Sequence, residues 1–273
     1  MIRAREATAF LLIPIVVAGI WYLPPWVYLA VVWLIGMMAA WELLALQRAL
    51  THPVQRVPTL VALGLALPAL WWGGLPNGGW ILAAVVLLVP LVYLLGRRPI
   101  EGATAGIADA VFTAVFFAVT GGAMGLLRTA FPGALGAKVV LTHCLTVWAG
   151  DSGAFYLGTR FGRHRLAPQV SPKKSWEGAV GGAAGTLFGV WFCRTVFFPE
   201  LSWLGAGVLA VALTILAPLG DLVESLFKRD AGVKDSSALI PGHGGFLDRT
   251  DSLFYAAPFV LALLLAVQGA LVP

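Results

Sequence analysis

The chain has 273 residues, of which 59% are hydrophobic and only 11% are charged, and its mean hydropathy is +0.88. This composition excludes a water-soluble globular protein and indicates an integral membrane protein. A net charge of +5 would suggest nucleic-acid binding in a soluble protein, whereas here we expect basic loops that face anionic membrane lipids and no nucleic-acid partner.

Apolar windows recur along the whole chain. A helix of about 20 apolar residues crosses the ~30 Å hydrocarbon core of a bilayer. The first and third windows are short, and the breaks at 24–25 and 76–79 could instead be re-entrant turns. We predict an all-α polytopic membrane protein of about nine transmembrane helices, at residues 7–23, 26–46, 58–75, 80–96, 104–127, 138–158, 177–198, 202–226 and 251–271.

No soluble segment or low-complexity linker interrupts these windows, so we expect one transmembrane domain over 1–273. Its N-terminal spans occupy about 1–136, and its C-terminal half, about 137–273, carries most of the polar residues. If the N-terminus is cytoplasmic, every Lys and Arg except Arg128, Lys138 and Arg194 falls in an inner loop. This bias is the positive-inside pattern, and it places the C-terminus outside.

The same orientation puts the polar loops 159–176 and 227–250 on the cytoplasmic face, where they predict a shared polar cavity. Asp151 and Asp221 lie near the inner ends of their spans. Carboxylates at such depth usually face a polar interior and mark function. We interpret Glu42 differently, as an interfacial charge whose side chain reaches water, and expect near-normal activity after Glu42→Gln.

One stripe of polar residues is predicted at the end of the span 202–226. Its members are spaced i, i+3, i+4 and i+7, which places them on one helix face. If the last span begins by Asp248, then Asp251 and Ser252 share a face in the same way. The stripe consists of Asp221, Glu224, Ser225 and Lys228.

Carboxylates beside clustered Lys and Arg are suited to a polyphosphate with a divalent metal. Mg²⁺ prefers oxygen ligands and keeps waters and substrate phosphates as the others. Lys and Arg neutralise phosphate oxygens. Lys173 and Lys174 add to this pattern, because they precede the span 177–198, where free N–H groups at a helix start also favour phosphate. Arg160, Arg163 and Arg165 suit anionic lipid headgroups equally well.

Polar residues recur at fixed spacing in the segment 225–251, which reads Ser225-x-x-Lys228-Arg229-x4-Lys234-Asp235, then Pro241-x-His243-Gly-Gly-x-x-Asp248-Arg249-x-Asp251. This pattern resembles the signature of the phosphatidate cytidylyltransferases, also called CDP-diacylglycerol synthases. The stretch from Asp151 to Glu177, and especially the sequence 171–178, is similar to the second characteristic loop of that family. The resemblance covers the chain from about residue 140 onward, while the earlier spans match only in being hydrophobic.

The resemblance implies transfer of CMP from CTP to phosphatidic acid in the inner, cytoplasmic membrane of the cell, by a homodimer. It implies that Asp221 and Asp248 bind Mg²⁺. A second cation, monovalent or divalent, is also compatible with the resemblance. Asp151, Asp235 and Asp251 are the next candidates as metal ligands. Lys228 and Arg229 are then catalytic, holding the triphosphate or the lipid phosphate. The further substrate contacts would be Ser171, Lys173, Lys174, Ser225, Lys234, Arg249 and His243, the last of which could equally be structural.

Two alternatives remain at this point. A cytidylyltransferase for another lipid phosphate, such as an ether lipid, would carry nearly the same residues. A non-enzymatic ion transporter would explain Asp109, Asp151 and Asp221 within spans. It would not explain the clustered Lys and Arg or the glycine-rich turn after Pro241.

Overall fold

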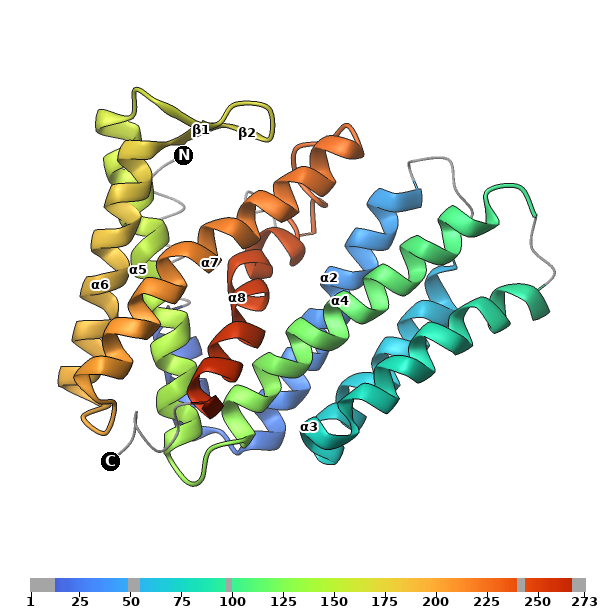
Figure 1. Cartoon of the computed structure of the whole chain (residues 1–273), viewed down its shortest axis with the longest axis horizontal. Helices are drawn as coiled ribbons and strands as arrows, with labels where there is room; N and C mark the ends of the chain where they lie inside the picture. Colours follow the sequence, from blue (N-terminus) through green and yellow to red (C-terminus); the bar gives the residue numbers. More distant parts are fainter. Residues whose placement is uncertain (1–12, 49–54, 97–99, 240–243, 267–273) are drawn as a thin grey trace. The chain divides into compact units, whose positions relative to one another are not determined.

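The computed structural model describes residues 13–48, 55–96, 100–239 and 244–266, and most of them are helical (Figure 1). A short apolar helix, Ile13–Tyr22, comes first. A two-stranded hairpin separates α5 from α6. The remaining elements are α2 (Pro25–Arg48), α3 (Arg56–Leu95), α4 (Ala103–Thr129), α5 (Leu135–Phe161), β1 (Arg165–Ala167), β2 (Ser171–Ser175), α6 (Trp176–Val196), α7 (Trp203–Asp230) and α8 (Leu247–Ala266).

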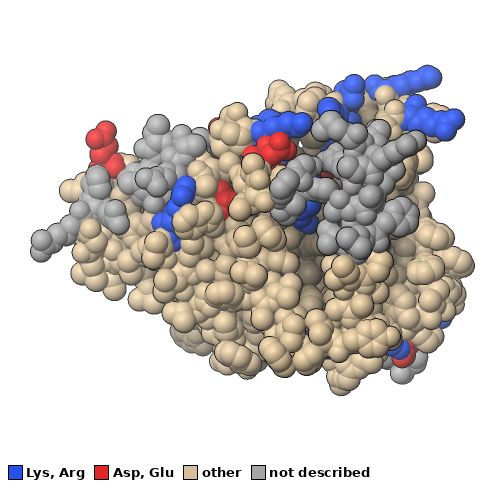
Figure 2. Space-filling model, turned by 180° about the vertical axis from the view of Figure 1, so that it is seen from behind, with Lys and Arg blue, Asp and Glu red and all other residues tan. Residues whose placement is uncertain are grey.

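These helices confirm the prediction of an all-α polytopic membrane protein. Within the described residues, six stretches are long and apolar enough to cross a membrane: Pro25–Gln47, Arg56–Gly74, Pro76–Leu95, Ala103–Thr129, Trp203–Asp230 and Leu247–Ala266. Helices α5 and α6 and the short first helix occupy the positions of the other predicted spans. The surface seen in Figure 2 is mostly uncharged, as a lipid-facing surface requires.

The third and fourth predicted spans form the two arms of α3. Gly74 separates the arms with φ 65° and ψ −177°, a backbone conformation that essentially only glycine adopts. The break therefore lies just before the Pro76–Gly79 stretch where the sequence indicated it. Pro76 instead opens the second arm, a position where the missing N–H of proline costs nothing.

The chain forms two compact units. The first comprises Met1–Leu23, Ala130–Leu226 and Asp251–Pro273, and the second comprises Pro24–Thr129 and Phe227–Thr250. Helices α7 and α8 each contribute to both units. The single-domain assignment made from the sequence stays a prediction.

Polar side chains tie the helices of the second unit to one another. The Tyr28 hydroxyl of α2 donates to the Met124 carbonyl of α4 at 3.0 Å, and the Trp71 indole of α3 donates to Gly122 of α4 at 3.1 Å. Thr113 of α4 donates to the Gln47 side chain at 2.9 Å. Such bonds between helices contribute most where water does not compete for them.

Glycines pack α5 against α6 in the first unit, as the glycine-rich sequence 178–189 predicts. A Cβ at Gly153 would collide with the Gly181 carbonyl, and one at Gly185 would collide with the Ala149 carbonyl. The two backbones are therefore in direct contact, which only small residues allow.

The hairpin between α5 and α6 was expected to be an irregular polar loop. Strands β1 and β2 pair antiparallel, with Arg165 opposite Ser175. Ser175 then caps α6, because its hydroxyl accepts a hydrogen bond from the Gly178 N–H at 3.1 Å. Glu177 in the first turn accepts from the backbone N–H groups of Arg163 and His164 at 3.0 and 3.2 Å. The hairpin is thus fixed to the start of α6 at both of its ends.

Replacing Gly185 by alanine should lower the stability of the protein, because the new Cβ would press the two helices apart. We expect a loss of about 1 to 3 kcal/mol, measured as a lower thermal-unfolding midpoint in detergent. Gly207 of α7 is the matched control, since a Cβ there meets no heavy atom within 4 Å. Gly207→Ala should leave the midpoint unchanged or raise it. Equal midpoints for the two variants would contradict the close contact of α5 and α6.

Candidate functional site

Three carboxylates gather in the first unit. Asp221 and Glu224 lie on α7 and Asp251 lies on α8, and one oxygen from each falls within 4.8 Å of the other two. Ser225, one turn after Asp221, donates to the Asp221 carboxylate at 3.3 Å, which confirms that the predicted stripe forms one helix face. Carboxylate oxygens so close together are a donor set that suits a hard divalent cation.

The hairpin supplies a cation to this cluster. The Lys174 ammonium on β2 lies 2.9 Å from the Asp221 carboxylate and donates to the Pro218 carbonyl at 3.3 Å. Successive side chains of a strand point to opposite faces. Lys173 accordingly is exposed, while Lys174 is partly buried. The two lysines that the sequence paired as anion ligands therefore differ in their surroundings.

Asp151, ten residues before the end of α5, belongs to the same unit and interacts electrostatically with Asp221 and Lys174. It was predicted as a second-rank metal ligand. The structure groups Asp251 and Glu224 with Asp221 more closely. Glu224 was placed in the stripe from its spacing but was not chosen as a ligand, and its low exposure of 3% is the feature that the sequence could not reveal.

Asp248 lies in the second unit, in the first turn of α8, so the helix begins before the predicted span 251–271. Its Oδ1 accepts a hydrogen bond from the Lys228 ammonium at 2.6 Å. Its Oδ2 accepts from the Ser236 N–H at 2.9 Å, the Ser236 hydroxyl at 2.7 Å and the Gly245 N–H at 2.8 Å. Asp221 belongs to the other unit, so the joint ligation of one ion by Asp221 and Asp248 stays a prediction.

The other predicted site residues are mostly at the surface. Among them, the Arg229 guanidinium donates to the Val233 carbonyl at 2.9 Å, which closes the end of α7. Ser171 begins β2 and is partly buried. His243 lies outside the described residues. Arg229, Lys234, Asp235 and Arg249 are exposed.

The interpretation of Glu42 as a charge that reaches water is wrong. This side chain of α2 is only 1% exposed. It accepts hydrogen bonds from two serine hydroxyls and from two backbone N–H groups at the start of α8. The sequence missed these contacts because the partners lie about 200 positions further along the chain.

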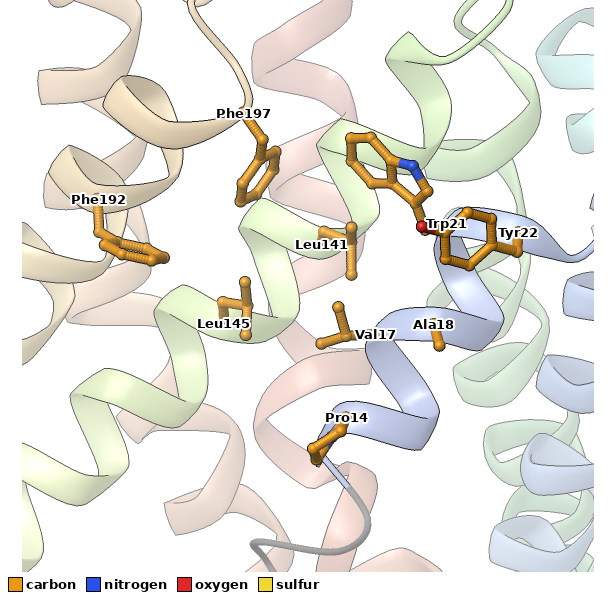
Figure 3. Close-up of a pocket in the computed structure, with 9 residues that line it drawn as sticks. All are labelled: Pro14, Val17, Ala18, Trp21, Tyr22, Leu141, Leu145, Phe192 and Phe197. Atoms are coloured by element: carbon orange, nitrogen blue, oxygen red, sulfur yellow. The ribbon is translucent and has the colours of Figure 1, made fainter.

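A cavity of about 440 Å³ in the first unit has a different character. The short first helix, α5, α6 and the residue Phe197 just after α6 line it (Figure 3). Trp21 and Phe197 meet edge to face at its rim, with ring centroids 5.9 Å apart. None of the predicted site residues lines this cavity, so it is separate from the carboxylate cluster.

The chain as a whole is similar to known proteins. The profile of the cytidylyltransferase family matches residues 3–267. A phosphatidate cytidylyltransferase of Pseudomonas aeruginosa is 34% identical over 97% of this chain and 98% of its own length. The phosphatidate cytidylyltransferase of Haemophilus influenzae is 48% identical over 45% of this chain and 44% of its own length, so that match spans less than half of either protein.

Replacing Lys228 by methionine should destabilise the protein, because the Asp248 carboxylate would lose its cation. The backbone and hydroxyl donors to Asp248 remain, so we expect a loss of about 2 to 3 kcal/mol, below the usual cost of a broken buried pair. Lys228→Arg keeps the charge and should lose less. Lys234→Met, at an exposed lysine of the same segment, should change stability by less than about 0.5 kcal/mol. Thermal-unfolding midpoints in detergent compare the stability of the three variants. Equal losses for Lys228→Met and Lys234→Met would refute the ion pair of Lys228 with Asp248.

Proposed function

Because this nucleotidyltransferase chain belongs to the cytidylyltransferase family, we propose that it transfers CMP from CTP to phosphatidic acid, giving CDP-diacylglycerol and pyrophosphate. The observation that carries this proposal is the match to the Pseudomonas aeruginosa phosphatidate cytidylyltransferase over 97% of the chain. The carboxylates and lysines described above are compatible with it, since they suit a metal-bound triphosphate. The ion-transport alternative would explain the carboxylates, but it explains neither the clustered lysines nor the match to this relative.

The reaction asks the protein mainly to position charges. An oxygen of the lipid phosphate attacks the α-phosphorus of CTP, the bond from that phosphorus to the bridging oxygen breaks, and pyrophosphate leaves. The attacking phosphate is already anionic at neutral pH, so no strong general base is needed. Charge neutralisation and alignment should therefore supply most of the rate.

Asp221, Glu224 and Asp251 fit a divalent cation by their donor atoms and spacing. We assign Mg²⁺ to these three carboxylates, with Asp248 as a further ligand. Asp151 and Asp235 are the next candidates as ligands. A second cation, monovalent or divalent, could bind nearby. Bound Mg²⁺ would supply positive charge to the phosphate oxygens. Lys174 already meets Asp221, and it would orient the carboxylate toward such a site.

The basic residues would bind the phosphates. An ammonium has three N–H donors, so the bond from Lys228 to Asp248 does not preclude another to a phosphate. Arg229 and Lys173 are exposed and would contact the triphosphate or the lipid headgroup. Ser171, Ser225, Lys234, His243 and Arg249 complete the proposed substrate contacts.

We place the active site in a polar cavity at the cytoplasmic side of the inner membrane, with the N-terminus inside and the C-terminus outside. Loops rich in Lys and Arg support this orientation. Soluble CTP and membrane-bound phosphatidic acid could both reach such a cavity. A homodimer is part of the proposal, on the family resemblance alone.

Two labels of CTP test the reaction directly. With phosphatidic acid and Mg²⁺, the purified protein should move ³²P from the α-position of CTP into the lipid fraction, while ³²P from the γ-position should stay in water with pyrophosphate. Asp221→Asn and Asp248→Asn should each lower the rate about 100-fold or more, because they weaken binding of the cation that would neutralise the phosphates. Asp230→Asn, at an exposed aspartate on the same helix as Asp221, should keep wild-type activity. Lipid labelled by the γ-phosphate would refute nucleotidyl transfer, and a faster reaction with an ether-lipid phosphate would favour that substrate.

Metal binding can be measured without turnover. Mn²⁺ is a paramagnetic substitute for Mg²⁺, and the free ion is quantified by electron paramagnetic resonance. Asp221→Asn and Asp251→Asn should each raise the Kd of Mn²⁺ about 10-fold or more. Asp248→Asn should do the same if it ligates the same ion, whereas Asp230→Asn should not. Unchanged Mn²⁺ binding in the first two variants would refute the metal assignment.

A further inference from the structure

Glu42 is a buried carboxylate in the N-terminal part of the chain, where nothing in the sequence indicated a site. It lies in the second half of α2 and is 1% exposed. A carboxylate withdrawn from water is costly unless hydrogen-bond donors replace the water. The position of Glu42 therefore depends on its donors.

Four hydrogen bonds hold the carboxylate. Oε1 accepts from the Ser237 hydroxyl at 2.7 Å and from the Phe246 N–H at 3.1 Å. Oε2 accepts from the Ser236 hydroxyl at 2.9 Å and from the Leu247 N–H at 2.8 Å. An ionised carboxylate has about four acceptor positions, so these donors satisfy it.

Two of the donors belong to the start of α8. The first N–H groups of a helix have no partner within it, and the helix dipole favours negative charge there. Such groups are usually capped by a nearby residue, but here Glu42 caps them from another helix. Its carboxylate thereby fixes the position at which α8 begins.

The other contacts connect Glu42 to Asp248. The Ser236 hydroxyl lies 2.9 Å from Glu42 and 2.7 Å from Asp248, so a single hydroxyl bridges two carboxylates. A Cβ at Gly245 would collide with both Ser236 and Glu42, so no side chain larger than glycine fits at this point. Asp248 in turn holds the Lys228 ammonium at 2.6 Å.

We propose that Glu42 is a positioning residue for the transferase reaction. It holds Ser236, Ser237 and the start of α8 so that Asp248 and Lys228 keep their orientation, and it does not touch the substrates. This inference rests on the proposed function, because it gives Asp248 and Lys228 their importance. It reverses the expectation that Glu42→Gln would retain near-normal activity.

The test compares Glu42→Gln with Glu101→Gln, a change at an exposed glutamate. Glutamine keeps the volume of Glu42 but turns one acceptor oxygen into an NH₂ donor, which faces two donors of the site. The folded fraction of Glu42→Gln is assayed well below its Tm with α-labelled CTP and phosphatidic acid. We expect its kcat to be about 10- to 100-fold lower than that of the wild type. Glu101→Gln should keep wild-type kcat.

A double-mutant cycle separates positioning from loss of stability. If Glu42 acts through Ser236, the effect of Glu42→Gln on kcat should be smaller in a Ser236→Ala background than in the wild type. Amide exchange at 245–248 should also be faster in Glu42→Gln. If Glu42→Gln does not fold, Ser237→Ala, which removes one of the four bonds, should still lower kcat about 3- to 10-fold.

The outcomes distinguish the two proposals. Wild-type kcat in folded Glu42→Gln, with wild-type protein active, would overturn the role of Glu42 and leave the proposed function intact. Effects on kcat that are additive in the cycle would also overturn it. If the wild-type protein transfers no label into lipid, that result would overturn the proposed function and, with it, the role of Glu42.

Discussion

A carboxylate removed from water is stable only where cations or hydrogen-bond donors replace that water, and this requirement organises the polar part of the chain. Asp248 meets Lys228, Glu42 meets two hydroxyls and two backbone N–H groups, and even Asp221, whose side chain is 39% exposed, meets Lys174. Each of these contacts joins residues from different elements. The charges therefore determine where a strand, a loop and the start of a helix lie, as well as what the site can bind.

The apolar part of the chain is held by other means. Apolar side chains gain little by leaving lipid for a helix interface, so close packing and hydrogen bonds carry more of the association. The glycine contacts of α5 with α6 and the hydrogen bonds from tryptophan and tyrosine side chains of α2 and α3 to carbonyls of α3 and α4 are of this kind. Neither kind of contact requires water nearby. This separation allows a polar, solvated site to exist on a scaffold that is otherwise apolar.

Local patterns allowed most of the helices and the α7 stripe to be predicted. Hydropathy over about 20 residues depends on the segment alone, so the spans could be located. The stripe from Asp221 to Lys228 follows from helical spacing, and it formed as expected. The break at Gly74 was displaced by a few residues because Pro76 can open a helix as well as end one.

Contacts between distant residues could not be predicted in the same way. The partners of Glu42 lie 194 to 205 positions away, and a lone glutamate in an apolar span carries no mark of its future donors. The hairpin was missed because its strands are short, polar and contain a proline at 172, none of which favours a strand. Asp151 and Asp251 were both candidates, and only the packing of α7 and α8 grouped Asp251 with Asp221 and Glu224.

The alternation of side chains along β2 gives two neighbouring lysines unequal tasks. Exposed Lys173 gives up only solvent when it binds an anion, whereas Lys174 already donates to the Asp221 carboxylate and the Pro218 carbonyl. In the proposed site, Lys173 would therefore meet an incoming polyanion first, and Lys174 would add a contact through the one N–H that its two partners leave over. A five-residue strand is enough to give the two lysines these unequal roles, since it needs no moving part beyond the two side chains.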